Sequence, residues 1–118
     1  MRLHDPLIAL ADVLRAGREV ERFLRDRTLA DYESDRLLSS AVERQFEIIG
    51  EALTRALRAD PGMEVRLPEA RSVVGLRNRL AHGYDTIDDR LVWSLATQRL
   101  PELLVTVRGI VGEETDHG

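Results

Sequence analysis

The sequence predicts an all-α protein, an up-and-down bundle of four to five helices, and two observations support this. Apolar residues recur at helical spacing over most of the 118 residues. No segment alternates apolar and polar residues as a half-buried strand does, and no Asn-Gly hairpin signal is present. A chain of this length can bury one core without disulfides or metal, so residues 1–118 are expected to form a single domain.

The first helix is expected to run from Pro6 to about Arg27. Asp5 can cap its start, and Pro6 suits the first helical position. Gly17 lies inside this helix at a cost of about 1 kcal/mol relative to alanine, and a close approach of a second helix is one explanation for it. The apolar residues follow helical spacing: Leu7, Leu10, Ala11, Leu14, Val20, Phe23 and Leu24.

The second helix is expected from Leu37 to about Arg58, after a polar connection over residues 28–35 in which Ser34 or Asp35 is the cap. Its apolar face is broad. Glu51 lies within this helix and is either a solvated residue or a partner for an arginine of the next helix, at position 71, 77 or 79. The apolar face comprises Leu38, Ala41, Val42, Phe46, Ile48, Ile49, Ala52, Leu53, Ala56 and Leu57.

A loop is expected over residues 59–67. The third helix is expected to be short, opening at Pro68 after this loop and ending before Gly83, because glycine just past a periodic segment stops a helix. Its buried side would be Val73, Val74, Leu76 and Leu80.

The last helix, capped by Thr86 or Asp88, should run to about Val111. Pro101 removes one helical hydrogen bond and is expected to kink this helix. The polar tail over residues 112–118 is expected to fray.

Composition excludes several classes of function. The chain has no cysteine, and therefore no disulfide, thiol nucleophile or cysteine-based zinc site. No constellation has metal-ligand spacing, and no glycine-rich phosphate loop is present. No apolar run approaches the roughly 20 residues that span a membrane, and there is no signal peptide. We therefore expect a soluble, cytoplasmic protein with no metal, no cofactor and no membrane partner.

The net charge of −4 argues against nucleic-acid binding through bulk charge. All 17 basic residues are arginine. Four of them lie between Arg66 and His82, where the only acidic residue is Glu69. This local excess of positive charge is sufficient to attract a phosphate group.

The run from Gly75 to Tyr84 concentrates the candidate chemistry. His82 is the only histidine away from the termini. On an ideal helix, Arg77 and His82 would point about 140° away from each other. Cleavage of RNA through its own 2′-hydroxyl needs a base, an acid and a cation, which histidine and arginine can supply. One histidine and one arginine are a small set for the three roles of base, acid and cation. The spacing therefore favours a homodimer, which supplies two histidines and two arginines.

Four residues separate Arg77 from His82, and one residue separates His82 from Tyr84. This spacing resembles the signature of the HEPN ribonucleases. More narrowly, it resembles the HepT-like toxins of bacterial toxin–antitoxin pairs, and the resemblance covers nearly the whole chain. Further similarities are the asparagine after the arginine, a block of the second helix and two residues of the last helix: Asn78, residues 48–52, Trp93 and Pro101.

The resemblance implies a metal-independent endoribonuclease that needs no cofactor and acts as a homodimer on RNA, not DNA. His82 would be the general acid and base, and Arg77 the cation that binds the phosphate and stabilises the transition state. Asn78, Arg79 and Glu51 would support these two residues.

The resemblance also implies regulation at Tyr84. In the family, a partner antitoxin, an MntA-like nucleotidyltransferase, adds AMP units from ATP to this tyrosine and silences the toxin. An anionic phosphate beside His82 and Arg77 would occupy the position of the RNA phosphate. Toxin and antitoxin could then form a larger hetero-oligomer.

Two other functions are open at this point. The chain could be a non-catalytic helical subunit that docks a nucleotidyltransferase and helps to hold nucleotide. It could also be a helical interaction domain in which the motif is a coincidence. In that case His82 would be a helix-capping residue, Tyr84 a packing anchor and Arg79 an ordinary surface residue.

Overall fold

The computed structural model describes residues 5–83 and 87–116, and these ranges contain helices and connections but no strand. The all-α prediction is confirmed. The elements in chain order are α1 (Pro6–Leu24), α2 (Leu29–Ser34), α3 (Arg36–Ala59), α4 (Met63–Arg66), α5 (Ala70–Ala81), α6 (Asp89–Ser94), a π-helical turn η1 (Leu95–Arg99) and α7 (Leu100–Asp116).

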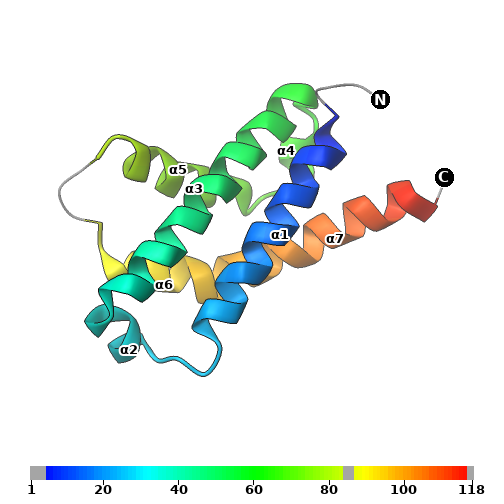
Figure 1. The fold of residues 1–118 in the computed structure, drawn as a ribbon. Coiled ribbons are helices and arrows are strands. Elements are labelled where there is room, and N and C mark those ends of the chain that lie inside the picture. Colours follow the sequence, from blue (N-terminus) through cyan, green and yellow to red (C-terminus); the bar gives the residue numbers. More distant parts are fainter. Residues whose placement is uncertain (1–4, 84–86, 117–118) are drawn as a thin grey trace.

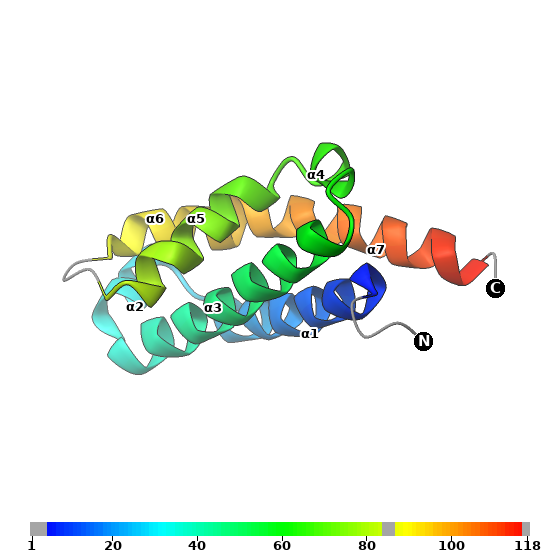
Figure 2. The ribbon, with the colours of Figure 1, turned by 90° about the horizontal axis from the view of Figure 1, so that it is seen from above.

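Helix α3 lies at the centre of the bundle, because α1, α2, α4 and α5 all contact it. Helices α1 and α3 run side by side in opposite directions (Figure 1). Seen from above, they form one layer, and α5, α6 and α7 form the other (Figure 2). The start of α1 and the end of α7 lie toward one end of the molecule and α2 lies at the opposite end. This arrangement leaves one side of α5 at the surface.

A single apolar cluster holds the two layers together, with Phe46, Ile49 and Leu53 of α3 fully buried within it. Gly17 of α1 marks a close approach to α7, because a Cβ atom at this position would lie 2.5 Å from Leu104 Cδ2. The explanation proposed for this mid-helix glycine from the sequence is therefore confirmed.

Residues 28–35 were expected to be a connection, but they contain helix α2. The hydroxyl of Thr28 accepts a hydrogen bond from the Asp31 N–H at 3.1 Å, and the Asp31 carboxylate accepts one from the Thr28 N–H at 2.9 Å. This reciprocal capping box starts the helix and lowers the pKa of Asp31. The buried ring of Tyr32 then packs against Trp93 of α6, with 5.9 Å between ring centroids.

The second expected loop, residues 59–67, also contains a helix, the short α4, which is held by the buried side chain of Met63. Helix α5 begins at Ala70, slightly later than the expected opening at Pro68. The four expected helices are present as α1, α3, α5 and the continuous segment of α6, η1 and α7, and the short helices α2 and α4 are additions to the predicted bundle.

The last helix was expected to kink at Pro101, and the feature that the structure shows beside this residue is the π-helical turn η1, which ends immediately before α7. The N–H of Leu100 donates to the carbonyl of Leu95, one residue further back than in an α-helix. Proline has no N–H to continue the α-helical ladder, so a local change of pitch at this point is expected. Asp88 caps α6, one of the two caps expected, and Thr86 lies outside the described residues.

Helix α7 continues to Asp116, past the expected end near Val111. None of the helices in the described ranges has the length and apolar character needed to cross a bilayer.

Candidate active site

Helix α5 places the candidate residues, and its own sequence decides which side is buried. Ala70, Val73 and Leu76 recur at three-residue spacing and are buried against the bundle. The helix ends at His82, whose N–H donates to the Asn78 carbonyl at 3.1 Å. Gly83 follows in the left-handed region with φ 65°, the conformation that favours glycine after a helix. The backbone thus fixes His82 as an exposed residue at the helix end.

Arg77 is half-buried, and the aliphatic part of its side chain packs against α3. The contact point on α3 is Gly50: a Cβ atom there would overlap Arg77 Cβ and lie 2.6 Å from Arg77 Cγ. The absence of a side chain at position 50 therefore allows α3 and α5 to approach each other, and the aliphatic part of Arg77 packs against the backbone at Gly50.

The guanidinium of Arg77 contacts the side chain of the next residue in its own helix. Its Nη1 donates to Asn78 Oδ1 at 3.1 Å. Asn78 and His82 are four residues apart, so they lie on the same face of α5. The long side chain therefore brings the cationic group to the face that carries His82, although the two backbone positions point in different directions.

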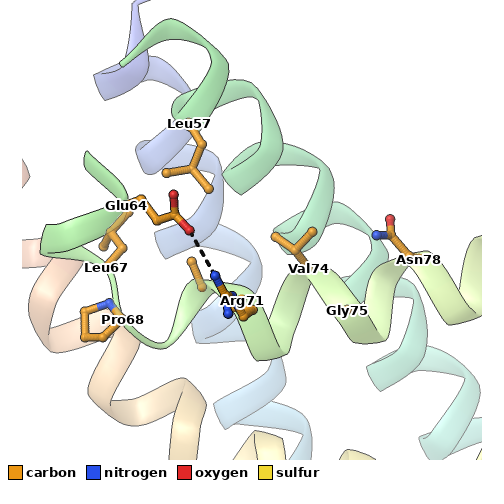
Figure 3. Close-up of a pocket in the computed structure, with 9 residues that line it drawn as sticks. Leu57, Glu64, Leu67, Pro68, Arg71, Val74, Gly75 and Asn78 are labelled. Carbon is orange, nitrogen blue, oxygen red and sulfur yellow. Dashed lines mark ion pairs between the residues drawn. The ribbon is translucent and has the colours of Figure 1, made fainter. Parts of the chain in front are cut away.

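A pocket opens on this face beside Asn78, with a volume of about 560 Å³. Five of its lining residues come from α5, and the others come from the end of α3, from α4 and from the turn before α5 (Figure 3). Across it, Arg71 Nη2 lies 3.6 Å from Glu64 Oε1, and both side chains are largely exposed. The lining residues named in Figure 3 are Leu57, Glu64, Leu67, Pro68, Arg71, Val74, Gly75 and Asn78.

The remaining sequence-predicted residues are not joined to this group by the described contacts. Arg79 is exposed and makes no ion pair within residues 5–83 and 87–116. Glu51 is exposed on α3, and in the same part of the chain it forms no hydrogen bond or ion pair with an arginine of α5. Tyr84 lies outside the described residues.

Two residues that matter to this geometry were not assigned a site role from the sequence, Gly50 and Gly75. Each lies inside a helix, where glycine costs about 1 kcal/mol relative to alanine. That cost was a signal that each glycine either allows close helix packing or leaves space for a ligand. Which of the two applies depends on how the helices pack, and the sequence does not show this. In the described ranges, no group of three or more histidine, aspartate or glutamate side chains is arranged to hold a metal ion.

Comparisons with known proteins identify the family to which this chain is similar. The family model described as "Ribonuclease HepT-like" matches residues 13–110. "Putative RNase MJ1380" of Methanocaldococcus jannaschii is 31% identical over 105 residues, which cover 87% of this chain and 94% of that protein. "Probable ribonuclease HepT" of Thermococcus cleftensis is 30% identical over 94 residues, covering 80% of this chain and 84% of that protein. No solved structure matches the chain.

Proposed function

The chain belongs to the HepT-like ribonuclease family, and we propose that it is a metal-independent endoribonuclease, the toxic component of a toxin–antitoxin pair in the cytoplasm. The observation that carries the proposal is the Arg77 guanidinium bonded to Asn78 on the face of α5 that ends at His82. This face presents a cation, an amide and an imidazole to solvent within about two turns of helix.

The chemistry that suits these groups is transfer of the RNA phosphate to the neighbouring 2′-oxygen. The 2′-oxygen forms a bond to phosphorus as it loses its proton to a base, and the bond to the 5′-oxygen breaks as that oxygen receives a proton from an acid. The products are a 2′,3′-cyclic phosphate and a 5′-hydroxyl. His82 serves as the base or the acid. Arg77 binds the phosphate and stabilises the charge that builds on its oxygens.

A second copy of the chain completes the site. One imidazole cannot be base and acid at the same moment, and His82 is the only histidine in the part of the chain that the structure describes. A two-fold arrangement of two α5 helices would place two copies of His82 and two of Arg77 around one phosphate. We therefore propose that the active species is a homodimer with a composite site, in which Asn78 orients Arg77, and Arg79 and Glu51 have supporting roles.

The direct test is cleavage of single-stranded RNA by the pure protein in the presence of EDTA. We expect cleavage to persist, to leave 2′,3′-cyclic phosphate ends, and to stop at any position where a single 2′-deoxynucleotide replaces the ribonucleotide. Cleavage at the 2′-deoxy position, or loss of activity in EDTA that added Mg²⁺ restores, would contradict the mechanism.

Regulation is proposed at Tyr84, where a partner MntA-like nucleotidyltransferase would add AMP from ATP. Expression of the chain alone should arrest growth, and co-expression of the partner should restore it. The Tyr84→Phe variant should remain toxic in both cases because it lacks the acceptor hydroxyl. A chain that is harmless when expressed alone would instead favour the non-catalytic, nucleotide-holding subunit.

A further inference from the structure

We propose that the pocket beside Asn78 binds an unpaired RNA base next to the bond that is cut, and so sets the sequence preference of cleavage. The inference rests on the proposed ribonuclease function. It concerns a different part of the surface from the groups that move protons, and it has its own test.

The pocket is continuous with the candidate active site through Asn78. This residue lines the pocket, accepts the hydrogen bond from Arg77 and shares a helix face with His82. Four of the α5 residues of the pocket form a single stripe that leads toward the helix end, because Val74 and Gly75 are each three or four residues from both Arg71 and Asn78. A strand of RNA with its phosphate at His82 would therefore pass over this opening.

The lining of the pocket suits a nucleobase. Its interior is apolar, formed by Leu57, Leu67 and Val74, and charged or amide groups lie at its edge. Its volume of about 560 Å³ falls within the roughly 300–1,000 Å³ typical of small-molecule sites. Proteins read single-stranded RNA by holding splayed bases against apolar or guanidinium surfaces and by bonding their polar edges. Arg71, Glu64 and Asn78 supply such a surface and such partners.

Arg71 is available for this role because its present contact is weak. Its side chain is 90% exposed, and the ion pair with Glu64 spans 3.6 Å at the surface (Figure 3). Exposed pairs of this kind contribute little to stability. A base or a phosphate can therefore replace this contact at small cost, and Glu64 is then free to accept a hydrogen bond from an exocyclic amine.

Gly75 keeps the pocket open. A Cβ atom at this position would have nothing within 4 Å, and the residue does not adopt a left-handed conformation. Neither the backbone nor the packing of the described residues therefore requires glycine here, although glycine weakens a helix. The empty volume at Gly75 is the space in which the base would lie.

The test is to fill the space at Gly75 with a large side chain. Gly75→Phe introduces a ring at a pocket-lining position where a Cβ atom would have nothing within 4 Å. Gly109→Phe is the matched control, since Gly109 is also an exposed helical glycine whose Cβ would have nothing within 4 Å. The substrates are short RNAs randomised on both sides of the cleaved bond. We expect Gly75→Phe to lower kcat/KM by at least about tenfold and to flatten the sequence preference, because stacking on a base is lost. We expect Gly109→Phe to behave as the parent does.

A second measurement separates this inference from the proposed function. Binding of 2′-O-methyl RNA, which cannot be cleaved, should weaken in Gly75→Phe and not in Gly109→Phe, even if the parent cleaves no RNA at all. Equal rates, preferences and affinities for Gly75→Phe and the parent would overturn the base-binding pocket. A Gly75→Phe protein that becomes monomeric while the parent is dimeric would also overturn it, because a second copy of the chain would then be the occupant.

Discussion

Replacing His82 by alanine is expected to lower the rate of RNA cleavage by about 10²–10⁴-fold, the contribution that general acid–base catalysis makes. The fold should survive, because His82 is exposed and its helix-ending hydrogen bond comes from the backbone N–H. In a homodimer the substitution removes both imidazoles, and therefore both the base and the acid. The measurement is the single-turnover rate on a defined RNA, with the melting temperature recorded for the same samples.

The control for this prediction is His117→Ala, which removes the histidine next to the C-terminal residue and should leave the cleavage rate unchanged. A His82→Ala protein that melts at the parent's temperature and cleaves at the parent's rate would remove His82 from the mechanism.

Replacing Gly50 by leucine is the second large effect we expect, and it acts on stability and activity together. A Cβ atom at position 50 overlaps Arg77 Cβ, so α5 must move away from α3 to admit the new side chain. Overpacking of this kind typically costs about 1–3 kcal/mol of unfolding free energy. The displaced Arg77 would also lose its position relative to Asn78 and His82, so cleavage should fall more than in a variant of equal stability that is altered elsewhere.

Gly109→Leu serves as the matched control, because it introduces the same side chain at a helical glycine with open space around it. Urea denaturation and cleavage rates of the two variants should differ clearly. If Gly50→Leu were as stable and as active as Gly109→Leu, the packing of Arg77 against Gly50 of α3 would have no role in the site.

The long helices were predictable because their signals are local and repeated. Asp5 with Pro6, Asp35 and Gly83 mark helix ends through capping chemistry that acts within a few residues. The short helices were missed because a helix of one or two turns carries too few apolar positions to show a period. Helix α2 depends on the Thr28–Asp31 capping box and on Tyr32 packing against Trp93, a residue distant in the sequence.

The candidate site was predictable in part. Arg77, Asn78 and His82 could be named from their spacing and from the resemblance to a known family. How Arg77 reaches the His82 face could not, because it depends on a side-chain conformation and on the packing of Arg77 against Gly50. The pocket was also beyond sequence reasoning, since residues of three helices and a turn form it only after α3, α4 and α5 have packed.

The most direct test of a site shared between two copies is to mix the parent with an Arg77→Ala, His82→Ala double variant and allow the subunits to exchange. If each site needs both chains, only dimers of two intact chains are active, and an equal mixture retains about one quarter of the activity of the same total amount of parent. If each chain acts alone, the mixture retains about one half. A value near one quarter is the result we predict, and a value near one half would contradict the composite site.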